Sequence, residues 1–178
     1  MPPVMLRAKY IVVHHPASDN IALTLRDHIH PPFTDAPYDF WVEYPSGDVV
    51  KGRVLSKIGA HVQPDVPGKY ANRPDAIRKI NNRTAIGYAF EGNFDDERPP
   101  IGPSEAQIER GALHVAQTCE EYGIHPHDHR RPLEQIIAEG GVVPHLFVSD
   151  TVCPGRHFMA QWDAFIGKVR YYYNSLRG

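Results

Sequence analysis

Short apolar runs and amphipathic helical patterns alternate along this chain, and this alternation limits the possible folds more than any other feature. Residues 10–13 and 85–90 are rich in β-branched and aromatic residues, which predicts two buried strands. A helix is predicted to begin at Ser104, which has capping-box spacing to Gln107 and is followed by apolar residues at helical intervals. Alternating strands and helices indicate one central sheet with helices packed on both faces. We therefore expect an α/β (α+β) fold in which residues 1–178 form a single domain.

A hairpin pattern makes part of the expected sheet antiparallel. Residues 38–44 are aromatic and β-branched, residues 45–48 (Pro-Ser-Gly-Asp) are typical of a turn, and residues 49–53 form the return strand. A helix is predicted over residues 21–30, and an amphipathic helix over residues 158–176. The central sheet is therefore expected to be mixed.

Composition and charge exclude several classes of function. The chain is 42% hydrophobic and 22% charged with a formal net charge of −2, so it lacks the basic excess that is typical of nucleic-acid-binding proteins. No segment approaches the roughly 20 apolar residues of a membrane span. Residues 1–10 hold no apolar stretch long enough for a signal peptide. We expect a protein that is made in the cytoplasm, needs no protein partner, and reaches any external substrate by release or export.

The two cysteines of the chain are expected to differ in role. Two cysteines cannot form a disulfide scaffold, and a domain of this size does not need one. Cys119 lies within the helical pattern and is interpreted as a small buried hydrophobic residue. Cys153 precedes Pro-Gly in a polar loop, which is a poor place for a structural thiol. The second cysteine is therefore the candidate for chemistry.

Three potential metal ligands lie where predicted strands end or in the loop beyond them. His14 follows the strand at 10–13, His145 follows a short strand at 142–143, and Cys153 comes after the next polar loop. Strand ends that open onto one edge of a sheet are where α/β proteins build their sites. Two imidazoles and a thiolate form a known catalytic zinc set, and zinc lowers the pKa of water to about 7. The chain has 11 histidines, so spacing alone leaves other His–Cys pairings open.

The sequence around these residues resembles the zinc-dependent N-acetylmuramoyl-L-alanine amidase family, which includes peptidoglycan recognition proteins and phage-lysozyme-type amidases. The motifs occur in the order of the family and span residues 11–156. Each motif alone is weak, but seven in order form a specific signal. The matching segments are residues 11–15, Tyr38-Asp39-Phe40, and residues 47–53, 59–61, 85–94, 103–107 and 145–155.

The resemblance implies a substrate, a cofactor and a ligand set. Enzymes of this family hydrolyse the amide bond between N-acetylmuramic acid and L-alanine in peptidoglycan. His14, His145 and Cys153 correspond to the residues that hold Zn²⁺. A phage or prophage endolysin and a bacterial autolysin with an unusual export route both fit a chain of this kind.

The resemblance also implies roles for residues that do not bind the metal. Tyr38 would face the metal and donate a hydrogen bond to the oxyanion, a contact typically worth about 3 kcal/mol in the transition state. Thr151 lies two positions before the cysteine ligand, where phage-type members carry Lys and recognition-type members often carry Thr. His61 would line the cleft, and an exposed loop histidine is the equal alternative. Ala89 stands where an anhydro-sugar recycling branch carries Glu, and the loop at 62–82 is longer than the family norm.

Other polar residues are expected to have structural or incidental roles. His15 points to the opposite side of the strand from its neighbour and is interpreted as structural or as supporting the site. Glu91 is interpreted as solvated or structural, with a catalytic base as the lesser alternative. The tract at 125–129 is expected to be an exposed loop with adventitious metal affinity. Residues 171–173, three tyrosines, are expected to be partly core and partly surface.

Three classes of function stay open at this point. The first is a zinc amidase. The second is a peptidoglycan-binding module on the same fold, which would be marked by loss of the cysteine ligand. The third is a metal-free cysteine hydrolase that pairs Cys153 with His145.

Overall fold

A five-stranded mixed sheet forms the centre of the molecule, seen in a computed structural model that describes residues 7–16, 38–51, 72–99 and 101–178. Its strands are β1 (Tyr10–His14), β2 (Phe40–Val42), β3 (Val49–Lys51), β4 (Ala85–Phe90) and β5 (Gly141–Pro144). Their order across the sheet is β3-β2-β4-β1-β5. β1 pairs in parallel with β4 and β5, β2 pairs in parallel with β4, and β2 and β3 form the antiparallel hairpin. The expected mixed sheet and hairpin are confirmed.

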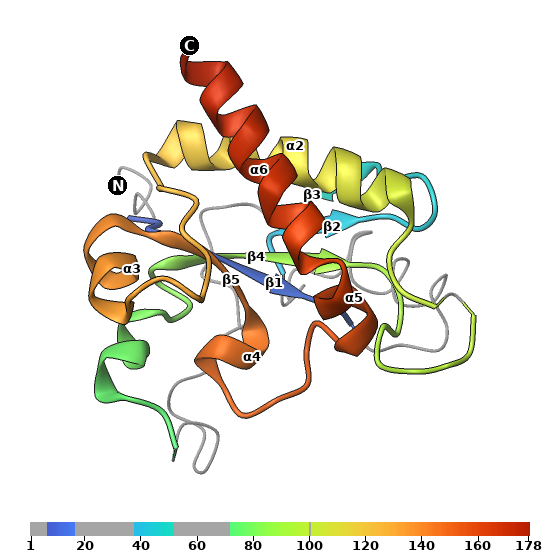
Figure 1. Ribbon diagram of the computed structural model, residues 1–178, viewed down its shortest axis with the longest axis horizontal. Helices are drawn as coiled ribbons and strands as arrows, with labels where there is room; N and C mark the ends of the chain where they lie inside the picture. Colours follow the sequence, from blue (N-terminus) through green and yellow to red (C-terminus); the bar gives the residue numbers. More distant parts are fainter. Residues whose placement is uncertain (1–6, 17–37, 52–71, 100) are drawn as a thin grey trace, which may run out of the picture.

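Helices cover both faces of this sheet, as the alternating pattern predicts (Figure 1). One face packs on α2 and α6, and the other packs on η1, α3 and α4. Among the described residues no helix is long and apolar enough to cross a membrane. The helices are η1 (Asp75–Lys79, a 3-10 helix), α2 (Glu105–Tyr122), α3 (Leu133–Glu139), α4 (His145–Val148), α5 (Arg156–Ala160) and α6 (Trp162–Arg177).

The strand β1 is buried on both sides, which explains its continuous apolar sequence. Ile11 and Val13 belong to the core that faces α2 and α6. Tyr10 and Val12 belong to the core on the opposite face. Because side chains alternate along a strand, His14 at its end lies on the face of Tyr10 and Val12.

The helix α2 begins and ends where its sequence predicts. The Ser104 side chain accepts the backbone N–H of Gln107, and the Gln107 side chain accepts the backbone N–H of Ser104, so both halves of the capping box form. Gly123 ends the helix with a φ of 67°. The buried Gln107 amide also donates to the carbonyls of Val42 and Glu91. The first turn of α2 is thereby fixed to the ends of β2 and β4.

One predicted helix is wrong in its extent, and several predicted features lie outside the described residues. The amphipathic pattern at 158–176 forms two helices, α5 and α6, because the chain breaks at Gln161 (φ −103°, ψ 7°). The Gln161 side chain donates to the carbonyl of Pro103, while Phe158 and Trp162 on either side of the break enter the same core. The predicted helix at 21–30 and much of the long loop before η1 lie outside the described residues.

Candidate metal centre

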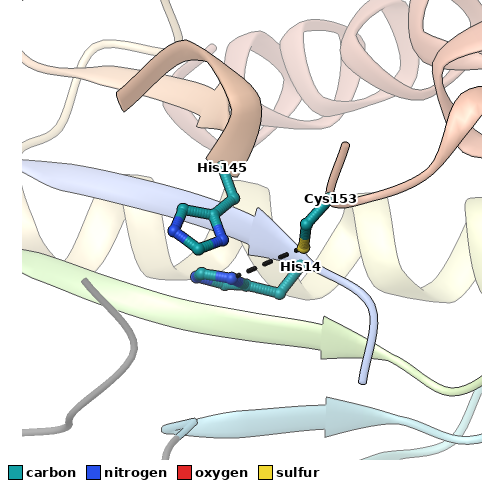
Figure 2. A group of neighbouring side chains, drawn as sticks. All are labelled: His14, His145 and Cys153. Carbon is teal, nitrogen blue, oxygen red and sulfur yellow. Dashed lines mark hydrogen bonds between the residues drawn. The ribbon is translucent and has the colours of Figure 1, made fainter. Parts of the chain in front are cut away.

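Two neighbouring parallel strands bring the first two histidines together. β1 and β5 pair with Val13 opposite Pro144, so His14 and His145 follow at the same end of the sheet. Their ring centroids lie 4.4 Å apart at an interplanar angle of 57°. Figure 2 shows the two rings stacked obliquely, one from the end of β1 and the other from the start of α4. The register of the sheet therefore sets the spacing of this pair.

The Cys153 sulfur completes a group of three donor atoms (Figure 2). One atom from each of His14, His145 and Cys153 lies within 4.8 Å of the others. The Cys153 Sγ is 3.8 Å from Nδ1 of His14. Tetrahedral zinc with ordinary bond lengths separates a nitrogen and a sulfur ligand by about 3.6 Å. The donor set and its spacing therefore fit a zinc ion, and no other His, Cys, Asp or Glu group of this kind occurs among the described residues.

Two of the three donors are buried and the third is more exposed. A catalytic zinc site, which keeps one position open to water or substrate, is compatible with this difference. His14 is 1% exposed and Cys153 is 8% exposed, whereas His145 is half-buried. Burial raises the pKa of the Cys153 thiol to about 12, and the backbone N–H of His15, which donates to Sγ at 3.3 Å, acts in the opposite direction. A thiolate at this position is therefore favoured by a cation beside it.

Two polar residues support His145, and sequence reasoning missed both of them. Ser149 is buried, and its Oγ lies 3.2 Å from Nε2 of His145. The Arg73 guanidinium donates to the carbonyls of Leu146 at 2.7 Å and Ser149 at 3.3 Å, which holds the α4 turn in place. Contacts of this kind orient a ligand imidazole. The spacing of four residues from His145 to Ser149 is a signal for the first contact, because such residues are neighbours on a helix.

Tyr38 lies beside His14. Its ring centroid is 4.9 Å from that of His14 and 5.2 Å from that of Trp41, which it meets edge-on at 84°. Trp41, Ala89 and His14 are register partners across β2, β4 and β1, so their side chains share one face. The small Ala89 lies between the two rings that Tyr38 contacts. Burial raises the pKa of Tyr38, so its phenol stays protonated and can donate a hydrogen bond.

Comparison with known proteins assigns the family. The profile described as N-acetylmuramoyl-L-alanine amidase matches residues 5–156. The chain belongs to this amidase family. A peptidoglycan-recognition protein from Drosophila simulans is 27% identical over 169 residues, which cover 89% of this chain and 75% of that protein.

Solved structures of amidases and recognition proteins have the same fold. The N-acetylmuramoyl-L-alanine amidase LysC from Clostridium intestinale superposes with a TM-score of 0.60 and 22% identity, covering 90% of this chain and 86% of that chain. Drosophila peptidoglycan recognition protein SD superposes with a TM-score of 0.56 and 21% identity, covering 88% of this chain and 79% of that chain. The predicted fold of the amidase family is confirmed.

The remaining amidase-site predictions have different outcomes. Thr151 is half-buried in the loop before Cys153, and its Oγ accepts the backbone N–H of Cys153 at 3.2 Å. That contact uses Thr151 as an acceptor, so its hydroxyl proton stays available for donation. His61 lies outside the described residues.

Glu91 is a buried residue directly after β4. It is fully buried, and its Oε2 accepts the backbone N–H of Tyr44 at 2.6 Å. Burial raises the pKa of its carboxyl to about 7, against the effect of the Tyr44 N–H. The burial of this residue shows that the solvated interpretation is wrong, and its hydrogen bond fits the structural one.

The histidine tract at 125–129 is only partly the exposed loop that its sequence suggests. Asp128 is 4% exposed and His127 is half-buried, while His125 is exposed. The Asp128 carboxylate accepts hydrogen bonds from Arg130 and from Arg170 of α6. The loop is thereby bound to the helical layer. The expected pattern of partly buried and partly exposed tyrosines is confirmed at residues 171–173.

Proposed function

We propose that this protein hydrolyses the amide bond between N-acetylmuramic acid and L-alanine in peptidoglycan, with Zn²⁺ held by His14, His145 and Cys153. The observation that carries the proposal is the convergence of these three donors within 4.8 Å in a chain of the amidase family. When bound, zinc lowers the pKa of water to about 7 and polarises a carbonyl oxygen. The biological role that follows is degradation of the cell wall, as by an endolysin or an autolysin.

Tyr38 supplies a hydrogen bond to the scissile carbonyl oxygen as that oxygen gains negative charge. Its place beside His14, at 4.9 Å between ring centroids, and its raised pKa both support this role. A preorganised donor of this kind is worth about 3 kcal/mol in the transition state. The edge contact with Trp41 restricts the phenol ring to this place. Thr151 supplies a second, uncharged donor from the loop before Cys153.

The environment of Cys153 favours a ligand over a nucleophile. Cysteine nucleophiles are activated by a lowered pKa, usually beside a cation or at a helix N-terminus. The pKa of Cys153 is raised to about 12 by burial, and its sulfur lies 3.8 Å from one histidine of a pair. Two imidazoles around one sulfur are typical of a zinc site. Retention of this cysteine also supports catalysis over recognition without cleavage.

Digestion of purified peptidoglycan tests the proposal directly. The protein is incubated with and without a chelator, zinc is added back, and the products are identified by mass spectrometry. We expect free stem peptides that begin at L-alanine, their loss with chelator, and their return with zinc. Cleavage that resists the chelator would support a cysteine hydrolase. Binding to peptidoglycan without cleavage would support a recognition module.

A further inference from the structure

His15 is a buried histidine beside the metal centre that is not one of the converging donors. It follows His14 directly and is 4% exposed. Its side chain is not part of the three-donor group. We propose that His15 is a positioning residue that fixes the location of the Cys153 sulfur both through its backbone and through its imidazole. This inference rests on the proposed zinc site.

The first contact is made by the His15 backbone. Its N–H donates to Sγ of Cys153 at 3.3 Å. The partners are far apart in the sequence, so this contact joins the end of β1 to the loop that carries the sulfur. A backbone N–H aimed at sulfur stabilises the negative charge of a thiolate and sets its distance from the strand.

The second contact is made by the His15 imidazole. The backbone N–H of Phe94 donates to Nδ1 of His15 at 3.0 Å, and the two rings stack at 23° with centroids 6.0 Å apart. A ring nitrogen that accepts a hydrogen bond carries no proton, so the proton of the neutral ring is on Nε2. Nδ1 of His15 is therefore committed to the backbone of Phe94 rather than to a metal.

Phe94 in turn holds the chain that follows Cys153. Its carbonyl accepts the backbone N–H of His157 at 2.9 Å. A Cβ at Gly155 would lie 2.5 Å from the carbonyl carbon of Phe94, and the φ of Gly155 is +93°, so only glycine fits this approach. The segment from Cys153 to His157 therefore lies against a backbone that His15 anchors. His15 thus acts on the sulfur directly and through Phe94.

Two amide substitutions separate the contact at Nδ1 from the size and polarity of the side chain. Asn carries a carbonyl oxygen at the same number of bonds from Cα as Nδ1, so His15→Asn can still accept the Phe94 N–H. Gln places its oxygen one bond further away, near the position of Nε2. His15→Gln therefore keeps an amide but loses the acceptor at the required place, and His15→Ala loses it entirely.

The test measures zinc affinity by competition with a chromophoric chelator, together with the thiolate-to-metal absorption band of the Co²⁺-substituted protein. We expect His15→Ala and His15→Gln to bind zinc 10–100-fold more weakly, the range typical of residues that orient ligands. We expect a shifted or weakened cobalt band in both variants, and values close to the wild type in His15→Asn. The matched control is His114→Ala, which also removes a hydrogen bond from a histidine Nδ1, in this case to Tyr88 on the face of the sheet opposite His14.

The outcomes separate this inference from the proposed function. Wild-type protein that binds no zinc overturns both. Wild-type protein that binds zinc, with unchanged affinity and cobalt band in His15→Ala, overturns the positioning role alone. Equal weakening in the Asn and Gln variants also overturns it, because acceptance at Nδ1 would then not matter. This Asn–Gln comparison decides the question even if His15→Ala does not fold.

Discussion

The candidate metal centre takes one histidine from the end of β1 and the other from the start of α4, directly after β5, whereas the loop at 125–129 holds three histidines in five residues. In the metal centre, two imidazoles and a sulfur have donor atoms within 4.8 Å of one another. In the loop, Nε2 of His127 lies 2.6 Å from a carboxylate oxygen of Glu139, and the His129 ring meets the edge of Trp162 at 5.5 Å. A high local number of histidines in the sequence therefore does not by itself create a set of metal ligands.

The difference lies in what holds each group of side chains. The two histidines of the metal centre are held by backbone hydrogen bonds between parallel strands. The register of these strands sets the distance between residues at neighbouring strand ends. The loop is held by backbone hydrogen bonds to Glu139 and Val142 and by side chains, chiefly the buried Asp128 between Arg130 and Arg170. Removing one residue should therefore abolish metal binding in the first region and alter stability in the second. Four variants test this contrast.

The largest effect is expected from Cys153→Ser. Loss of the thiolate should weaken zinc binding by more than about 100-fold, beyond the range for residues that only orient ligands. Cleavage of peptidoglycan should fall below detection while the fold is kept, and metal content and circular dichroism measure these two properties. The matched control is Cys119→Ser, which alters the other buried free cysteine and should keep its zinc. Full zinc occupancy in Cys153→Ser would show that Cys153 is not a ligand. The contrast between a metal-binding region and a structural loop would then fail.

The next largest effect is expected from Tyr38→Phe, which separates chemistry from metal binding within the first region. Removing one oxyanion donor should lower kcat about 100–1000-fold while zinc content and KM stay the same. Steady-state kinetics on a soluble muramyl peptide measures kcat and KM separately. Tyr10→Phe is the control, because it makes the same change on the same face of the sheet at the other end of β1. Unchanged kcat in Tyr38→Phe would remove Tyr38 from the mechanism.

A moderate effect on stability alone is expected from Asp128→Asn. Burial by itself raises the pKa of this carboxyl, but the hydrogen bonds and charge of Arg130, with the charge of Arg170, hold its pKa below the usual range. A lowered pKa in the folded state contributes stability above the ordinary Asp pKa of about 3.9, and this contribution is lost as the pH falls through the folded-state value.

We expect Asp128→Asn to lower the free energy of unfolding by about 2 kcal/mol at pH 7, which is typical of hydrogen bonds to charged groups. The difference in the free energy of unfolding from the wild type should narrow below about pH 4, where the Asp128 carboxyl of the unfolded chain begins to protonate while that of the folded protein stays ionised. Urea unfolding of the metal-free wild type and variant, at pH 7 and again below pH 4, measures this difference. Zinc affinity at pH 7 should stay unchanged, and a parallel loss of zinc would show that the two regions are coupled.

The smallest effect is expected from the double substitution His125→Ala with His127→Ala. These residues lie outside the converging group, so zinc affinity should stay within about twofold of the wild type, as for surface changes remote from a site. Isothermal titration also gives the zinc stoichiometry. A fall from two bound ions to one would reveal a second metal site in the loop and would break the comparison.

Local patterns in the sequence were sufficient for much of the fold. The strands predicted at 10–13 and 85–90 and the capping box at Ser104 follow from the order of neighbouring residues, and all three form, the first strand with His14 added. The three candidate donors were predicted from strand ends together with the resemblance to the amidase family, and the structure places these side chains together.

The features that sequence reasoning missed depend on which segments become neighbours. The break at Gln161 accompanies a contact with Pro103, which no helical pattern can reveal. The Arg73 contacts with the α4 turn and the Phe94 contact with His15 likewise join segments that are distant in the sequence. Such contacts are consequences of the assembled sheet rather than of local residue preference.

The central position of β1 has a consequence for how the protein is synthesised. β1 comes early in the chain, yet its partners are β4 and β5, so Tyr10 pairs with Ala85 and with Gly141. Parallel pairing between such distant segments delays folding, because the intervening chain must close as a loop first. On the ribosome, β1 must wait for most of the chain to emerge before its second edge is covered. The candidate metal centre therefore cannot assemble before β5 and the loop that carries Cys153 have been synthesised.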